Sequence, residues 1–81
     1  MMYAYSHLAK GETCLKVYSI YTHDTVQPVY QVRAVLLRNN RVHYLPQHGP
    51  FLSFSLAESC HALLVLRCKE KGYDVCSSSC M

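Results

Sequence analysis

The 81-residue sequence has no tryptophan, only three glycines and three prolines, and only five acidic residues. It contains no apolar run near the roughly 20 residues that cross a bilayer. Its N-terminus lacks the charged-then-apolar order of a signal peptide. We therefore expect a cytoplasmic protein with no membrane segment. Because half of the residues are hydrophobic (51%) and few are charged (16%), we expect one small folded domain over residues 1–81.

The common catalytic signatures are also absent. There is no glycine-rich phosphate loop, no Gly-x-Ser-x-Gly and no His-Glu-x-x-His. Cys60 and His61 are neighbours in the sequence, but adjacent residues on a helix point about 100° apart and cannot form a nucleophile–base pair. The sequence therefore predicts a protein that is not an enzyme, with no catalytic residues, no cofactor and no metal site.

The five cysteines do not suggest a secreted disulfide framework, because their number is odd and no signal peptide precedes them. Cys60 and Cys68 fall on the predicted buried side of a helix, where a free cysteine behaves as a small hydrophobic residue. Cys76 and Cys80 could form a disulfide or hold a metal with a histidine, but the second ligand pair typical of zinc sites is missing. We expect the final "SSSCM" to be a frayed tail.

Three segments are typical of β-strands because β-branched and aromatic residues are frequent in them. They are Thr13–Thr22, Val29–Leu37 and Arg41–Leu45. The segments "HDTVQP" (23–28) and "PQHGPFLSF" (46–54) are predicted loops. "MYAYSHLA" near the N-terminus alternates weakly and is expected to pair back on the first of these strands. "YDVC" after the helix is a candidate short strand.

The turn between the second and third strands fixes a register. Asparagine tolerates positive φ, so Asn39-Asn40 is a credible two-residue hairpin turn. The predicted pairs are Arg38 with Arg41, Leu37 with Val42, Leu36 with His43, Val35 with Tyr44 and Ala34 with Leu45. Side chains alternate along a strand, so one face collects Tyr30, Val32, Ala34, Leu36 and Leu45. The opposite face carries Gln31, Arg33, Val35, Leu37, Val42 and Tyr44.

The stretch "FSLAESCHALLVLRCKEKGYDV" (54–75) predicts one α-helix. Ser55 and Glu58 have the spacing of a capping box, and Gly72 is suited to a left-handed residue that ends the helix. At about 100° per residue, the face expected to dock on the sheet comprises Leu56, Ala57, Cys60, Leu63, Leu64 and Cys68. The predicted fold is α+β: a small antiparallel sheet of three to four strands with one helix on one face, in the order βββα(β).

Basic and aromatic residues are predicted to gather around the uncovered side of this sheet. The candidate nucleic-acid or partner-binding residues are Lys16, Arg33, Arg38, Arg41 and Tyr44. Lysine and arginine exceed the acids by three, a mild excess that suits an acidic partner. In the first strand the sequence leaves open whether Lys16 and Tyr18, or Leu15 and Val17, point outward.

The second half of the chain resembles the WGR domain, a small α+β module named after a Trp-Gly-Arg turn between strands. "FSLAE" (54–58) and "KEKGY" (69–73) are similar to the start and end of that family's helix, and "KVYSIY" (16–21) is similar to its first strand. This sequence has no tryptophan, and Leu36-Leu37-Arg38 stands where the motif would be. In that family the arginine-bearing region contacts DNA ends or neighbouring domains, so the resemblance implies Arg38 as a DNA contact.

Two functions are compatible with these features. The first is a small binding module that contacts nucleic acid or a nucleoprotein complex through a basic and aromatic sheet face. The alternative is an inhibitor encoded by a phage or mobile element, similar to anti-CRISPR proteins in size, that blocks a host protein or nucleoprotein complex by direct protein–protein contact. Tyrosine and arginine also anchor protein–protein contacts, so composition does not separate the two partners.

The helix carries more apolar residues than one docking face needs. Ala62, Val65 and Leu66 fall outside the predicted docking face and are expected to be exposed. Burying such an aliphatic side chain is worth roughly 1.5–3 kcal/mol, and association first costs about 4–15 kcal/mol. The sequence therefore predicts a weak homodimer that uses these residues or an edge of the sheet.

Overall fold

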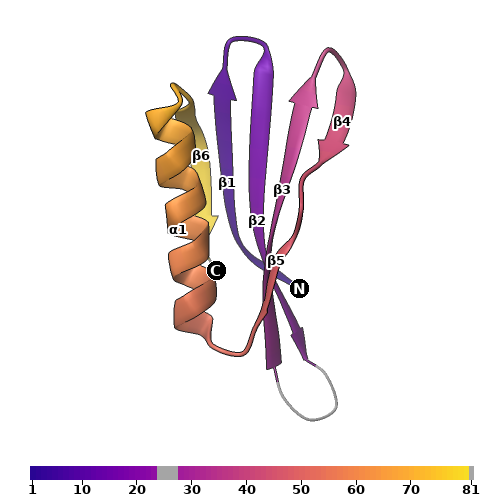
Figure 1. Ribbon diagram of the computed structural model, residues 1–81, viewed down its shortest axis with the longest axis vertical. Helices are drawn as coiled ribbons and strands as arrows, with labels where there is room; N and C mark the ends of the chain where they lie inside the picture. Colours follow the sequence, from indigo (N-terminus) through magenta and orange to yellow (C-terminus); the bar gives the residue numbers. More distant parts are fainter. Residues whose placement is uncertain (24–27, 81) are drawn as a thin grey trace.

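The computed structural model describes residues 1–23 and 28–80 and contains, within them, six strands and one helix. In chain order these are β1 (Met2–Lys10), β2 (Thr13–His23), β3 (Pro28–Arg38), β4 (Arg41–Tyr44), β5 (His48–Phe51), α1 (Phe54–Glu70) and β6 (Asp74–Cys80). All pairs are antiparallel. The order across the sheet is β4-β3-β2-β1-β6, and β5 pairs with β3 on the edge that β4 also uses. The helix packs on one face, so the predicted α+β class is confirmed (Figure 1).

The β3–β4 hairpin has the predicted register. Arg38 pairs with Arg41, and the pairing continues to Val35 with Tyr44. Asn39 and Asn40 have φ values of 52° and 60°, the left-handed conformation that a two-residue turn requires. The N-terminal segment also pairs back on β2 as expected, from Lys10 with Thr13 outward. Of the predicted loop at 23–28, residues 24–27 lie outside the described part of the chain.

The sheet has more strands than expected. β5 lies within the predicted loop 46–54 and contains Pro50, which an edge strand tolerates because the missing N–H is not needed on its free side. β6 extends the short "YDVC" strand through the serine-rich tail by pairing with β1, so the expectation of a frayed tail is wrong for residues 77–80. Serine has little strand preference of its own, and the partner strand supplies the order.

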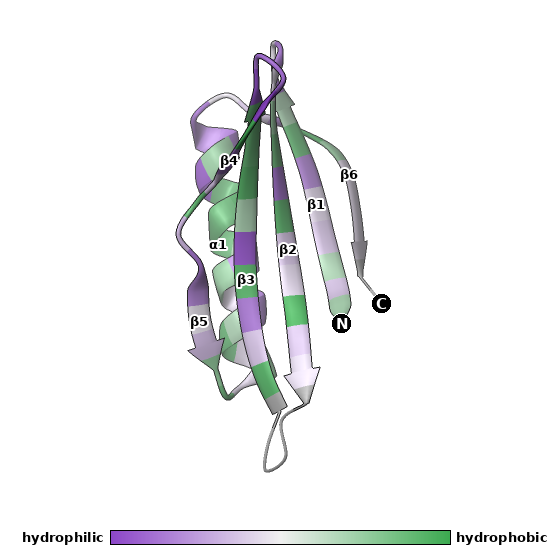
Figure 2. Ribbon diagram, turned by 90° about the vertical axis from the view of Figure 1, so that its right-hand side faces the viewer, coloured by the Kyte–Doolittle hydropathy of each residue, from purple (hydrophilic) through white to green (hydrophobic). Residues whose placement is uncertain are grey.

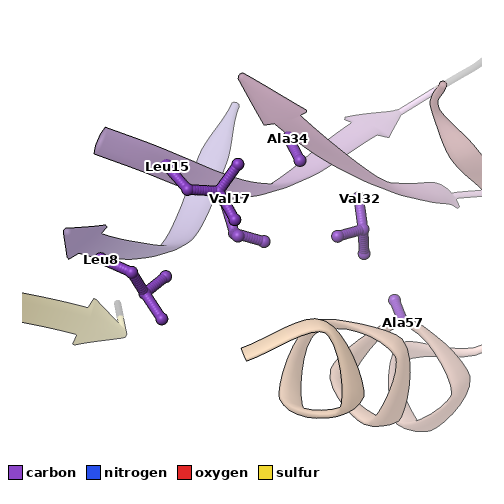
Figure 3. Packing of buried hydrophobic residues seen from close by; sticks show 6 residues of the cluster. All are labelled: Leu8, Leu15, Val17, Val32, Ala34 and Ala57. Atoms are coloured by element: carbon purple, nitrogen blue, oxygen red, sulfur yellow. The ribbon is translucent and has the colours of Figure 1, made fainter. Parts of the chain in front are cut away.

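The core lies between the sheet and the helix. Its buried residues come from β1, β2, β3 and α1, and Figure 3 shows them pointing into the space between these elements. They are Leu8, Leu15, Val17, Val32, Ala34 and Ala57. Because Leu15 and Val17 are buried, the alternating residues Lys16 and Tyr18 point to the uncovered face. This resolves the choice that the sequence left open.

The two ends of α1 differ in how well the sequence predicts them. The N-cap is Ser53, it makes no side-chain capping bond, and Ser55 lies inside the helix, so the predicted capping box is wrong. At the other end Gly72 has a φ of 97°. The Gly72 N–H donates to the Lys69 carbonyl at 3.0 Å and the Tyr73 N–H to the Cys68 carbonyl at 3.0 Å. These two bonds form a Schellman motif, which confirms the predicted stop.

The helix is rotated about its axis relative to the prediction. Ala57, Cys60, Leu64 and Cys68 pack on the core as expected. Leu56 and Leu63 were expected there too, but they are 59% and 47% exposed. Val65, expected in solvent, packs against the core instead. No helix in the described ranges is long and apolar enough to cross a membrane.

Candidate functional site

One face of the sheet has no helix over it. In Figure 2 the strands β1, β2 and β3 stand in front of α1, so the viewer looks onto this side. We call it the uncovered face. Because side chains alternate along each strand and Leu15, Val17, Val32 and Ala34 point to the helix, the residues between them belong to the uncovered face.

Two rows of side chains cross the uncovered face. In the first, Tyr5 pairs with Tyr18 and Tyr18 with Arg33. The rings of Tyr5 and Tyr18 have centroids 5.4 Å apart and planes inclined by 37°. The two strand pairings place an aromatic pair and an arginine in one row.

The second row lies next to the first. His7 pairs with Lys16, Lys16 with Val35, and Val35 with Tyr44. Tyr44 is one of the most exposed large side chains of the described chain, at 83%. Three of the five predicted binding residues, Lys16, Arg33 and Tyr44, therefore share the uncovered face.

The uncovered face has a hollow of about 590 Å³, lined in part by Tyr18, Arg33, Val35, Tyr44 and Gln47. It lies beside the edge of β3, between Val35, which pairs with β4, and Val32, which pairs with β5. In this gap the Arg33 Nε donates to the Gln47 Oε1 at 2.8 Å. The volume falls within the range of about 300–1,000 Å³ that small-molecule sites occupy.

Arg38 and Arg41 do not belong to this cluster. They face each other at the tip of the β3–β4 hairpin. Arg38 lies two residues beyond Leu36, which packs against the core, so alternation directs it to the helix side of the sheet. Its Nε donates to the Thr13 Oγ1 at 3.4 Å. The five predicted residues are thus divided between the two sides.

A second polar cluster lies on the helix side and was not predicted. The His61 ring sits between two serines of the sheet: its Nε2 is 2.8 Å from the Ser6 Oγ, and its Nδ1 is 2.6 Å from the Ser19 Oγ. Ser6 and Ser19 are only 5% and 1% exposed. Burial lowers the pKa of the His61 imidazole, which keeps the ring neutral at pH 7.

The cysteines of the described chain carry free thiols at Cys14, Cys60, Cys68 and Cys76. Burial raises the pKa of Cys60, and it raises that of Cys68 despite the opposing charge of Lys71. Neither thiol is therefore activated as a nucleophile. No group of three or more candidate metal ligands occurs among the described residues. The Cys80 side chain lies outside them, so its predicted alternatives with Cys76 are not addressed.

The residues predicted for self-association separate into two groups. Ala62 and Leu66 are exposed, whereas Val65 is half-buried against the core. The exposed leucines at 56 and 63 join Leu66 along the outer side of α1. An apolar row therefore exists on the helix, although its composition differs from the predicted one.

Comparison of the chain with protein-family models, with curated proteins and with solved structures found no match in any of the three. The resemblance to the WGR domain therefore stays a prediction.

Proposed function

We propose that the protein binds single-stranded nucleic acid on the uncovered face of its sheet. The observation that carries this proposal is the hollow lined by Tyr18, Arg33 and Tyr44, beside the ring of Tyr5 and the charge of Lys16. Aromatic side chains on a sheet surface stack with unpaired bases, and neighbouring cations contact the phosphates. An extended nucleic-acid strand that crosses the uncovered face would contact both the aromatic rings and the cations.

The size of the face sets the expected footprint. A four-stranded sheet face that binds RNA typically stacks two or three bases. Tyr5, Tyr18 and Tyr44 supply three rings on adjacent rows. Stacking contributes about 1–3 kcal/mol per base, so loss of one ring corresponds to roughly a 5- to 150-fold loss of affinity.

The direct test is fluorescence anisotropy with labelled ten-nucleotide single strands of DNA and RNA at 50 and 200 mM salt. If Lys16 and Arg33 each neutralise one phosphate, the slope of log K against log salt is about −1.4 for a single strand. That slope corresponds to a loss of about sevenfold between the two salt concentrations. Tyr18→Ala should weaken binding at both.

Matched charge variants distinguish this face from general basicity. The double variant Lys16→Ala/Arg33→Ala is expected to lose at least tenfold in affinity and most of the salt slope. Arg67→Ala/Lys69→Ala removes the same charge from the exposed last turn of α1 and should change affinity by less than twofold. Equal losses in both double variants, or no saturable binding to either strand at 50 mM salt, would rule out the proposal.

The alternative function, an inhibitor that covers a protein surface, predicts a different result. The uncovered face would then capture a protein or nucleoprotein complex that persists after nuclease treatment, with Tyr18 and Arg33 as anchors. Binding of isolated oligonucleotides would be absent. Nuclease-resistant capture by the wild type, lost in Arg33→Ala, would favour this function over the first.

A further inference from the structure

A second pocket lies on the opposite side of the sheet from the hollow of the uncovered face. It has a volume of about 270 Å³ and lies between β1, β2, β6 and the N-terminal half of α1. Its wall includes Tyr3, Ser6, Ser19, Phe54 and His61. The His61 cluster therefore forms part of a pocket wall and does more than connect the helix to the sheet.

The serines of the His61 cluster keep hydrogen-bonding groups that the cluster itself does not use. A neutral imidazole has one N–H donor and one acceptor nitrogen. One serine therefore accepts from His61, and the other donates to it. The accepting serine keeps its own O–H proton for another partner, and both oxygens keep lone pairs. Ser6 and Ser19 are nearly fully buried, and both line the pocket together with His61.

The rest of the wall favours a flat apolar molecule. The rings of Tyr3 and Phe54 have centroids 5.5 Å apart and planes inclined by 43°. Aromatic ligands pack well against such ring pairs in offset or edge-on arrangements. An apolar cavity of about 150 Å³ is known to hold benzene, so 270 Å³ accommodates two fused rings.

The charge of the wall selects against anions. His61 is neutral at pH 7 because burial lowers its pKa. Among the described residues that line the pocket, Glu58 is the one charged side chain. A carboxylate ligand would meet a like charge and no cation, whereas a neutral ligand pays no such electrostatic penalty.

We propose that this pocket binds a neutral, flat, two-ring aromatic molecule that carries one hydroxyl or carbonyl oxygen. The oxygen bonds to the Ser6–His61–Ser19 cluster, and the rings lie against Tyr3 and Phe54. The assignment is binding and not acyl transfer. β1, which carries Ser6, is paired along both edges with β2 and β6, so its backbone N–H groups are engaged in the sheet and not available as oxyanion donors.

The test uses 2-naphthol as the probe and follows the amide signals of the isotope-labelled protein during a titration. We expect saturable shifts at β1, β2, β6 and the N-terminal half of α1. The variant Ala62→Leu narrows the pocket from an exposed helix position and should weaken 2-naphthol at least tenfold. The matched control Ser59→Leu adds a leucine to an exposed site on the same helix that does not line the pocket, and should stay within twofold.

Two related probes test the chemistry of the site. Naphthalene lacks the oxygen, and 2-naphthoate carries a negative charge; each should bind at least tenfold more weakly than 2-naphthol. The proposal is overturned if 2-naphthol gives no saturable shifts at these elements, or if Ala62→Leu and Ser59→Leu have equal effects. Equal affinity for 2-naphthol and either related probe would likewise overturn it, because the cluster would then not recognise a neutral oxygen.

Discussion

Removal of the Ser19 hydroxyl tests how strongly the His61 cluster holds α1 on the sheet. In the wild type the Ser19 Oγ lies 2.6 Å from the His61 Nδ1, and Ser19→Ala removes this hydrogen-bond partner. Leaving a buried polar group without a hydrogen bond costs about 1–3 kcal/mol. The neighbouring pocket can admit water to the ring, so we expect the lower part of that range, about 1–2 kcal/mol.

This loss is large enough to measure in a domain of this size. For 60–100 residues, 1 kcal/mol shifts Tm by about 4–8 °C, so Ser19→Ala should melt roughly 4–16 °C below the wild type. Urea unfolding and thermal unfolding, both followed by circular dichroism, give the free energy of unfolding and Tm independently. The control is Ser59→Ala, an exposed serine on the same helix, whose free energy of unfolding should change by less than about 0.5 kcal/mol.

A double-mutant cycle isolates the hydrogen bond from other effects of the substitution. In a His61→Ala background the ring is absent, so Ser19→Ala should cost less than about 0.5 kcal/mol, and the coupling energy should be about 1 kcal/mol. The reasoning is refuted if Ser19→Ala is as stable as the wild type. It is also refuted if the substitution costs the same in both backgrounds.

Three further outcomes follow from the fold. Because burial lowers the pKa of His61, the free energy of unfolding should be highest above about pH 6.5, the pKa of the unfolded histidine, and should fall as the pH drops below it. Urea unfolding midpoints at pH 7.5 and 5.5 measure this loss, and His61→Gln should reduce the difference between the two midpoints. Gly49→Ala should destabilise more than Gly72→Ala in thermal melts, since both have positive φ but a Cβ at Gly49 would lie 3.0 Å from the Tyr30 carbonyl oxygen, whereas at Gly72 it meets only the Lys10 side chain. Light scattering up to about 500 µM should show a mass above 9.3 kDa that Leu63→Lys abolishes; a constant monomer mass would exclude the predicted dimer.

Local signals in the sequence were sufficient for much of the fold. The Asn39-Asn40 turn determined both the hairpin and its register, because two adjacent residues that tolerate positive φ leave little choice of geometry. Gly72 likewise determined the end of the helix. The grouping of Arg33 and Tyr44 on one face followed from alternation along paired strands, whereas the direction of Lys16 was left open by the sequence.

Features that depend on distant partners could not be predicted in the same way. Apolar residues occur on most sides of α1, so the periodicity of the sequence allowed more than one rotation of the helix about its axis. In the observed rotation, His61 bonds to Ser6 and Ser19 of the sheet. Ser6 and Ser19 lie 55 and 42 residues from His61, and no local pattern relates them. The strand β6 depends in the same way on pairing with β1.

That pairing has a consequence for the order of events during synthesis. β1 is synthesised well before β6, yet Ala4 pairs with Cys80 and Tyr5 with Ser79. Until β6 is available, the outer edge of β1 has open backbone donors and acceptors, which favour pairing with other chains. Chains released before residue 74 would therefore leave the edge of β1 open, whereas in the full sheet the serine-rich β6 occupies that edge. The serine-rich β6 therefore pairs with β1 late in synthesis and satisfies the backbone hydrogen bonds of its outer edge.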